Sequence, residues 1–313
     1  MKSKQITQKL AGQRGCLAAM SAVLLASTAA HAQPLKDGDW QAKAIAPVGN
    51  PLFFEDPRIY SELRPVFMQH WLPNNFDFKG GSVPLGGEVR VFAAQIRVKL
   101  TDRLALIATK DGYIEFRPDH TLSHQHGWAD LAAGLKYALI DDREKQLIVT
   151  PGFTVTLPTG NERVFQGHGK GEENIFVSAE KGWDNFHVTG NLGFRIPNDL
   201  DKQTAQIHYS LQLDYFVSKY FIPFFVANGY TILTDGKDTA SQSLNAVPLN
   251  AEGYDLINFG ASKASGSTQF TVGGGARSKI TKNADIGVAY EVGVIKPVGI
   301  FESRITADVS LHF

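Results

Sequence analysis

Cysteine is almost absent from this sequence, and its single copy lies in a segment that we expect to be removed. Cys16 falls within residues 1–32, where four basic residues, an apolar run and the small-x-small site Ala30-His31-Ala32 follow one another. This order is typical of a cleaved secretory signal peptide. The sequence therefore predicts that residues 33–313 carry no disulfide, thiol nucleophile or thiolate metal site.

Long apolar runs and an excess of basic residues are also missing. After residue 32 we find no run of about 18 apolar residues, so no helical membrane span is predicted. Residues 1–32 hold four of the 31 basic residues and none of the 31 acidic ones, which leaves 27 basic against 31 acidic residues. This balance excludes the basic footprint of a nucleic-acid-binding protein. The 30 glycines and the aromatic content of 11% are typical of many short strands.

The last eleven residues, 303–313, alternate strictly between apolar and polar side chains. Ile305 and Val309 fall on one face of an extended strand and Arg304 falls on the other, because successive strand side chains point to opposite faces. The chain ends on the aromatic Phe313. This ending resembles the assembly signal of bacterial outer-membrane β-barrels, which implies that the barrel-assembly machinery is a partner and Phe313 the residue it reads.

The same alternation predicts an all-β fold, a transmembrane antiparallel up-and-down β-barrel of about 12 strands. Each segment has about the 9–11 residues that a tilted membrane strand needs. The segments with the clearest pattern, together with the weaker first one, are Ile59–Leu72, Glu88–Leu100, Leu104–Phe116, Asp130–Leu139, Gln146–Leu157, Asn185–Ile196, Gln206–Tyr215, Gln269–Lys279, Asp285–Val294 and Ser303–Phe313.

Connection lengths orient this barrel, because bacterial barrels have short periplasmic turns and long outer loops. Short turns are predicted near 101–103, 141–146, 181–184, 218–219 and 281–283, and long loops at 118–127, 158–172, 197–203, 234–266 and 296–302. An even strand number requires Ile59–Leu72 to be a strand, although it contains Pro65. A topology with Asp255–Ala261 as a further strand is the alternative, and it breaks the parity. Lys110 interrupts the apolar face and predicts a bulge near Asp111-Gly112.

Residues 33–58 have no clean period and contain four prolines. We interpret them as an irregular periplasmic leader, with a partial plug folded into the lumen as the alternative. Residues 59–313 would form the barrel in the outer membrane of a Gram-negative cell, with outer-membrane lipids and lipopolysaccharide as neighbours. A soluble periplasmic β-sandwich is the competing architecture.

Several segments resemble outer-membrane barrels grouped with the meta-pathway phenol-degradation family. They are Val91–Gln95, Leu100–Tyr113, Leu157–Gly160, Val164–Gly167 and Ile286–Glu291. The resemblance implies a β-barrel and passage of small, aromatic or hydrophobic compounds across the outer membrane. It implies no substrate-binding residues for this chain.

The strand phase places charges of both signs in the lumen, which predicts a lattice of ion pairs more than a selectivity ring. The lumen-lining candidates are Arg97, Lys99, Asp130, Lys136, Arg195, Asp214, Arg277, Lys279, Glu291, Arg304 and Asp308. Arg97, Lys99, Arg277 and Lys279 lie near predicted periplasmic turns, so a basic inner mouth that favours anions is a further hypothesis.

Histidines offer two weaker chemical hypotheses. His120, His124 and His126 have a spacing that suits zinc or copper, but we prefer to interpret them as part of a flexible surface loop rich in polar residues, with no metal bound. His208-Tyr209-Ser210 resembles the His-x-Ser pair of outer-membrane phospholipases but lacks the following Asn-Gly, and its phase points into the lumen.

We therefore expect a small-molecule channel or facilitator that is not an enzyme and uses no cofactor. The alternatives are a lipid-modifying enzyme and a structural or surface-binding barrel with a closed lumen. The loop 234–266 either folds inward as a constriction or stands outside the barrel.

Overall fold

The computed structural model describes residues 40–78, 81–237, 252–296 and 299–313, and strands make up most of them. The predicted signal peptide, residues 1–32, lies outside the described residues. The strands are β1 (Glu62–Trp71), β2 (Asn75–Phe78), β3 (Gly81–Pro84), β4 (Glu88–Lys99), β5 (Leu104–Lys110), β6 (Tyr113–Arg117), β7 (Gln125–Trp128), β8 (Leu131–Tyr137), β9 (Ile140–Asp142), β10 (Leu147–Leu157), β11 (Glu172–Trp183), β12 (Phe186–Pro197), β13 (Gln206–Tyr215), β14 (Ile222–Ile232), β15 (Thr268–Lys279), β16 (Ala284–Gly293) and β17 (Ser303–His312).

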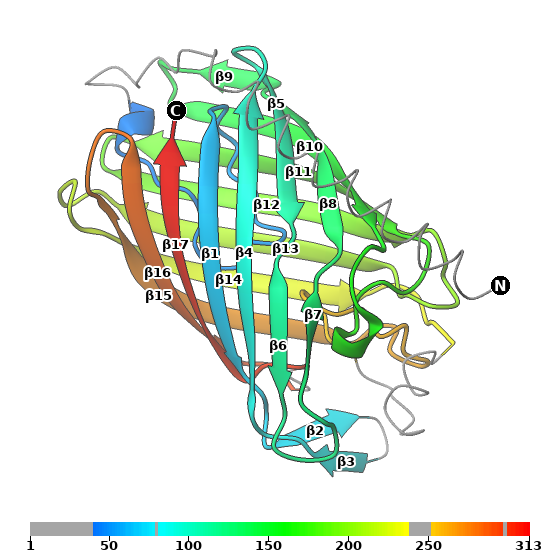
Figure 1. The fold of residues 1–313 in the computed structure, drawn as a ribbon. Helices are drawn as coiled ribbons and strands as arrows, with labels where there is room; N and C mark the ends of the chain where they lie inside the picture. Colours follow the sequence, from blue (N-terminus) through cyan, green and yellow to red (C-terminus); the bar gives the residue numbers. More distant parts are fainter. Residues whose placement is uncertain (1–39, 79–80, 238–251, 297–298) are drawn as a thin grey trace, which may run out of the picture. The chain divides into compact units, whose positions relative to one another are not determined.

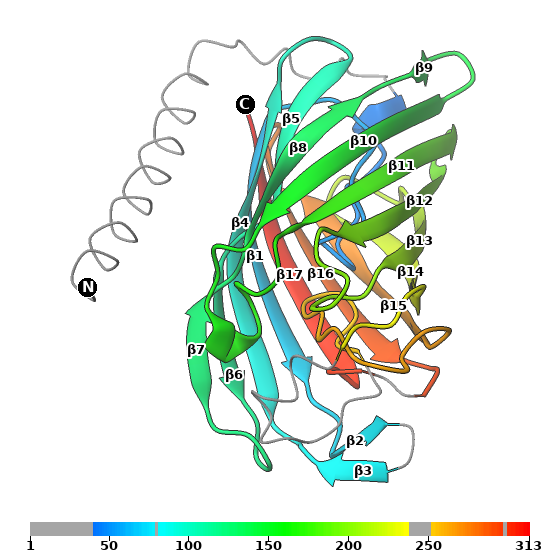
Figure 2. The same cartoon turned by 90° about the vertical axis from the view of Figure 1, so that its right-hand side faces the viewer.

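One antiparallel sheet closes on itself to form a barrel (Figures 1 and 2). Each strand from β10 to β16 pairs with its successor, and β1 pairs with both β17 and β4. Phe67 of β1 therefore lies opposite Ala307 on one side and Phe92 on the other. β5 and β6 together make one full-length strand of the barrel wall, which we call a stave, and β7 and β8 make another. Counted in this way, the wall has twelve staves. The predicted all-β, twelve-stranded barrel is confirmed, and its first strand is the one predicted from Ile59–Leu72.

The stave formed by β5 and β6 is interrupted where the sequence predicted a bulge. The pairing register shifts between Ala108 and Lys110. Gly112 has a φ of 110°, a left-handed conformation that a β-carbon disfavours. The Asp111 side chain accepts a hydrogen bond from the Ala94 amide at 2.9 Å, which satisfies a backbone group that the interruption leaves unpaired. The predicted loop 118–127 is shorter than expected, since β7 begins at Gln125.

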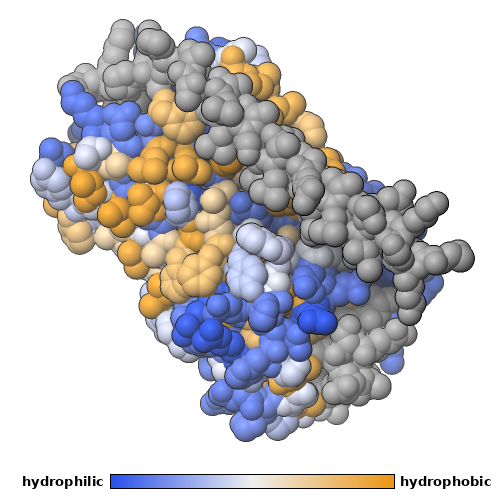
Figure 3. Space-filling view, viewed as in Figure 1, coloured by the Kyte–Doolittle hydropathy of each residue, from blue (hydrophilic) through white to orange (hydrophobic). Residues whose placement is uncertain are grey.

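The barrel has its apolar side chains outside and its charged side chains inside. Large apolar residues are exposed on the wall, among them Phe92 at 49%, Ile175 at 54% and Leu211 at 41%. Arg97 and Arg304 are each only 1% exposed. Apolar side chains gather over the middle of the face in Figure 3, with hydrophilic ones towards its ends. A soluble sandwich would bury its apolar face, so this arrangement suits a wall surrounded by hydrocarbon.

Short and long connections alternate around the barrel as the sequence predicted. One rim carries tight turns such as residues 100–103 and 184–185, and the opposite rim carries long connections. The connection after β1 contains the β2–β3 hairpin, which projects from this second rim in Figure 1. Within the described parts of the chain, no helix has the length and apolar character needed to cross a membrane.

Two segments that are not part of the wall are buried. The first, which we call the plug, is residues 40–59 and begins with the 3₁₀ turn η2 (Trp40–Ala42). The second, which we call the inward loop, is residues 252–266; Glu252, Asp255 and Asn258 are at most 3% exposed. The plug hydrogen-bonds to interior side chains of several strands, so the preferred prediction of a periplasmic tail does not describe it. The inward loop contains no strand, contrary to the alternative topology.

Candidate functional site in the barrel interior

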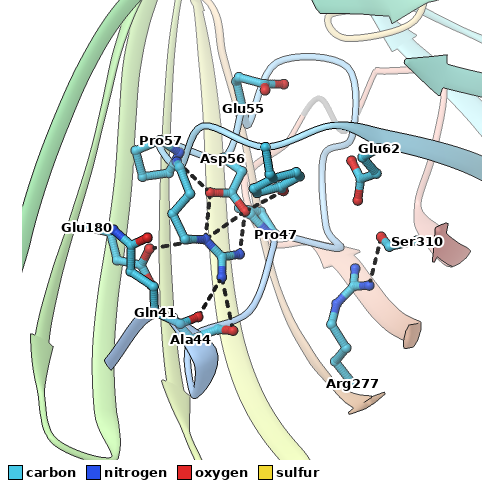
Figure 4. Close-up of polar contacts among 12 residues, drawn as sticks. Gln41, Ala44, Pro47, Glu55, Asp56, Pro57, Glu62, Glu180, Arg277 and Ser310 are labelled. Atoms are coloured by element: carbon cyan, nitrogen blue, oxygen red, sulfur yellow. Dashed lines mark hydrogen bonds and ion pairs between the residues drawn. The ribbon is translucent and has the colours of Figure 1, made fainter. Parts of the chain in front are cut away.

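Arg58 anchors the plug at its carboxyl end. Its guanidinium contacts the Asp56 carboxylate and donates to the carbonyl oxygens of Gln41 at 3.2 Å and Ala44 at 3.1 Å (Figure 4). Glu180 of β11 lies 3.7 Å from Arg58 Nε, within ion-pair distance but beyond a hydrogen bond. One buried side chain therefore holds the plug in its folded shape and turns it towards β11.

Glu55 connects the plug to two strands of the wall. Its carboxylate accepts from Arg97 of β4 at 2.6 and 2.8 Å and from Lys136 of β8 at 2.8 Å. Arg97 also donates to Glu62 of β1 at 2.7 Å. The Lys136 ammonium donates to the Asp56 carbonyl oxygen at 2.6 Å. Charge-assisted hydrogen bonds of this kind are about twice as strong as neutral ones, so Glu55 is a principal attachment of the plug.

A second group of ion pairs holds the inward loop. Arg304 of β17 pairs with Glu291 of β16 and with Asp255 of the loop. Arg195 of β12 makes a bidentate pair with Glu172 of β11 at 3.0 Å and also donates to the Tyr254 carbonyl oxygen at 2.5 Å. The constriction alternative for loop 234–266 therefore describes residues 252–266, while 238–251 lie outside the described residues.

The strands β1, β15 and β17 share a third lattice near the tight turns. Asp308 accepts from both Arg64 and Arg277, and Arg277 also pairs with Asp285. Arg64 in addition donates to the Pro47 carbonyl oxygen of the plug at 2.6 Å. Arg64 holds the plug from β1 and Lys136 holds it from β8, so charged groups of several strands bind the plug.

Seven of the eleven predicted lumen residues lie in these lattices, and Lys99, Asp130, Asp214 and Lys279 do not. Lys99 is partly exposed and pairs with Asp102 in the tight turn, at 2.7 Å. Asp130 supports an outer loop, where its Oδ1 accepts from the Gly160 and Gly167 amides at 2.9 and 2.8 Å. Asp214 pairs with His187 at 2.8 Å, and Glu291 also accepts from Asn228 at 2.7 Å.

The predicted basic inner mouth is not a set of free positive charges. Arg97 and Arg277 each contact two carboxylates, and Lys279 donates to the carbonyl oxygens of Ala42 and Ala44. Among the described residues, the buried ones include eight basic and twelve acidic side chains, so the interior is acidic on balance. The strand alternation placed Arg97 and Arg277 on the inner face, but it could not show that carboxylates of the plug and of neighbouring strands neutralise them.

The histidine hypotheses receive no geometric support. Within the described ranges, no group of three or more His, Cys, Asp or Glu residues is arranged to hold a metal ion, and His120, His124 and His126 are exposed. His208 is 0% exposed inside the barrel, where it contacts Asn174 Oδ1 at 2.7 Å. A lipid hydrolase needs its histidine at the lipid face, so this position does not suit that reaction.

The half of the interior nearest the long connections also contains a large apolar cluster beside the ion pairs that hold the inward loop. Rings from three separate segments form its core: Phe116 lies 5.6 Å from Phe165, and Phe165 lies 5.2 Å from Phe259 of the inward loop. Val89, Val91 and the inward-loop residues Leu256 and Ile257 pack in the same cluster. The sequence alternation predicted that the inward positions of β4 are polar. This holds for Gln95 and Arg97, but at the end of β4 nearest the long connections the inward side chains are the apolar Val89 and Val91.

Sequence reasoning missed the plug residues Glu55, Asp56 and Arg58, and it missed Glu62 and Arg64 of β1. The latter two alternate with Leu63 and Pro65 on the weakest predicted strand, so a strict reading of that strand would have found them. No local signal marks Glu55 as a partner for Lys136, because 81 residues separate the two.

Glu252 fixes the start of the inward loop. Its carboxylate accepts hydrogen bonds from the Phe259 and Ala261 amides, each at 2.7 Å. Burial raises the pKa of this carboxyl to about 7, although the two amide bonds act in the opposite direction. The loop therefore contains a group that changes its charge near neutral pH.

Comparisons with known proteins agree with this architecture. An outer membrane channel from Pseudomonas putida F1 has the same fold, with a TM-score of 0.57 and 15% identity, covering 86% of this chain and 100% of that chain. The NanC porin is less similar, with a TM-score of 0.45 and 8% identity, covering 81% of this chain and 98% of that one. The KdgM porin in complex with disordered oligogalacturonate also has a TM-score of 0.45, with 11% identity, covering 80% and 99%.

No curated protein sequence matches the chain. One family does: the family described as the MetA-pathway of phenol degradation matches residues 96–296, which is more than half of the chain. The match begins within β4 and ends just after β16, so it takes in nine of the twelve staves in full. The protein therefore belongs to the family described as the MetA-pathway of phenol degradation.

Proposed function

We propose that this protein is a channel for small molecules in the outer membrane. The observation that carries the proposal is the closed barrel with an apolar outer surface and a charged interior. Such a wall leaves no unpaired backbone edge in hydrocarbon, and it separates an aqueous lumen from lipid. The fold shared with the outer membrane channel from Pseudomonas putida F1 supports the same conclusion.

We further propose that the preferred solutes are small aromatic or hydrophobic compounds. The apolar cluster around Phe116, Phe165 and Phe259 would meet a solute that enters past the long connections. Aromatic rings favour offset or edge contacts with such side chains. The description of the family, which refers to phenol degradation, supports this substrate class.

The plug gives this channel a closed state. The plug bonds to β4, β8, β10 and β15, and these contacts cross the lumen. Transport therefore requires the plug to break its contacts with some of these strands and move away from them. Glu55 and Arg58 hold the plug through charges, while Phe53 and Phe54 of the plug also pack in apolar clusters of the interior, so movement of the plug breaks both kinds of contact. The competing function is a structural barrel in which the plug never moves.

The test is single-channel conductance of the mature chain in a planar bilayer, with a plug that can be locked. Asn50 Nδ2 donates to Ser210 Oγ at 3.2 Å, so Asn50→Cys with Ser210→Cys places two thiols within reach of each other. The predicted mature chain has no other cysteine. We expect discrete current steps in wild type and in the reduced double variant, and loss of these steps on oxidation.

Silence of both wild type and the reduced variant would overturn the channel and favour the structural barrel. Equal conductance in the reduced and oxidised forms would support a channel but contradict control by the plug. Uptake of phenol and of a sugar of similar size into liposomes then tests the substrate class, with faster entry of phenol expected.

A further inference from the structure

A polar patch lies on the inner face of β11, β12 and β13. The pairing register places Glu180 opposite Thr189 and Thr189 opposite Gln212, and the next row joins His187 to Asp214. Asn191 lies two residues beyond Thr189 on the same face of β12. The polar patch is therefore a contiguous surface made by Glu180, His187, Thr189, Asn191, Gln212 and Asp214.

Every side chain of the polar patch is at most 5% exposed, yet each has a polar atom without a hydrogen-bond partner in the protein. These atoms are both carboxylate oxygens of Glu180, His187 Nε2, Thr189 Oγ1, Asn191 Oδ1, both amide atoms of Gln212, and Asp214 Oδ2. Leaving a buried polar group unsatisfied costs about 1–3 kcal/mol. A surface with this many such groups is built to be satisfied by water or by a passing polar solute.

The plug faces this patch but bonds to it weakly. Trp40 and His187 have ring centroids 6.2 Å apart, and Trp40 Nε1 has no hydrogen-bond partner. Arg58 reaches Glu180 only at 3.7 Å. By contrast, Glu55 makes charged hydrogen bonds to β4 and β8. In the row of Asn191 the plug does bond to these strands, since Ser178 Oγ donates to the Glu55 carbonyl oxygen at 2.7 Å and Asn50 Nδ2 donates to Ser210 Oγ at 3.2 Å. Beside Glu180, His187 and Asp214 its contacts are the weaker ones given above, so the plug can separate from this part of the wall with a smaller loss of direct bonds.

The charges around the patch are negative on balance. Asp56, Glu180 and Asp214 supply three carboxylates here, against the two cations Arg58 and Lys279. Arg58 is paired with Asp56, and Lys279 donates to the carbonyl oxygens of Ala42 and Ala44. A confined aqueous path lined by carboxylates attracts cations and repels anions.

We infer that solutes cross the half of the barrel nearest the tight turns between the plug and the polar patch, and that this path favours cations over anions. The inference rests on the proposed function, because it assigns a route and a charge preference to that channel. It also restricts the substrate class: neutral and cationic small molecules pass, while anionic ones such as aromatic carboxylates are disfavoured.

The experiment measures the reversal potential of the open channel in a KCl gradient, for wild type and for Glu180→Gln with Asp214→Asn. We expect the wild-type channel to prefer potassium over chloride. In the double variant the ratio of potassium to chloride permeability should fall at least threefold. Asp102→Asn, which removes an exposed carboxylate in a tight turn outside the lumen, is the matched control and should keep the wild-type ratio.

Gln212→Lys adds one positive charge to the polar patch and should shift the ratio towards chloride, which keeps the test decisive if the double variant does not fold. A wild-type channel that prefers chloride, or a ratio unchanged in the foldable patch variants, would overturn the inference while leaving the channel intact. Absence of any current would instead count against the proposed function.

Discussion

At the scale of single residues, Glu55 decides whether the plug stays attached. Replacing it with glutamine removes the charge that Arg97 and Lys136 bind, and each lost charged hydrogen bond is worth about 1.5–3 kcal/mol. At about 1.4 kcal/mol per tenfold change, the plug should detach about 10- to 100-fold more often. Trypsin cleavage after the buried Arg58, followed by mass spectrometry of the protein in detergent, measures this change.

Glu62→Gln provides the control for that experiment. It also removes a buried carboxylate bound to Arg97, at 2.7 Å, but Glu62 belongs to the wall strand β1 and not to the plug. Cleavage after Arg58 should therefore rise much less than in Glu55→Gln. Equal cleavage in the two variants would show that Arg97, and not attachment of the plug through Glu55, protects Arg58.

At the same scale, the sequence predicted which face of a strand a side chain occupies better than it predicted the ion-pair partner of that side chain. Alternation alone placed Arg97, Lys136 and Arg277 on the inner face, because a strand has only two faces. It could not assign their partners, since Glu55 lies 42 residues from Arg97 and belongs to a segment without periodicity. The hypothesis of a basic mouth was made without these partners: Arg97 and Arg277 each pair with two carboxylates, one of which, Glu55, belongs to the plug.

At the scale of elements, the inward loop should respond to pH through Glu252. Its pKa is raised from 4.5 to about 7, so its neutral form is favoured in the folded loop. The folded loop is therefore most stable below pH 4.5, where Glu252 is neutral whether the loop is folded or open. This stability is lost as pH rises through about 7. The shift corresponds to about 3 kcal/mol. The loop should therefore open more readily at pH 8.5 than at pH 5.5.

A spin label at the exposed position Lys263 reports this opening as a growing mobile fraction in the electron paramagnetic resonance spectrum. Glu252→Gln stays neutral at both values of pH and should remove most of the difference. Label mobility that is equal at pH 5.5 and 8.5 in the wild-type background would refute the role of Glu252.

At the scale of the whole molecule, the barrel was predictable because closure and alternation are properties of the entire chain. Even the interruption at Lys110 was visible, since one residue broke an otherwise regular apolar face. The plug and the inward loop were not predictable in the same way. Their conformation depends on contacts with an interior that exists only after the barrel has closed. No repeating pattern of apolar and polar residues within these segments therefore predicts it.

The last prediction tests whether hydrocarbon surrounds the wall. Leu211, in the middle of β13, and Leu200, in the connection after β12, are 41% and 49% exposed. In water, arginine at either position would have a similar small effect. In a bilayer, Leu211→Arg should lower the free energy of unfolding by about 2–4 kcal/mol, whereas Leu200→Arg should change it by less than about 1 kcal/mol. Denaturant titrations of both variants in lipid vesicles measure the difference, and equal stabilities would contradict a membrane-spanning barrel.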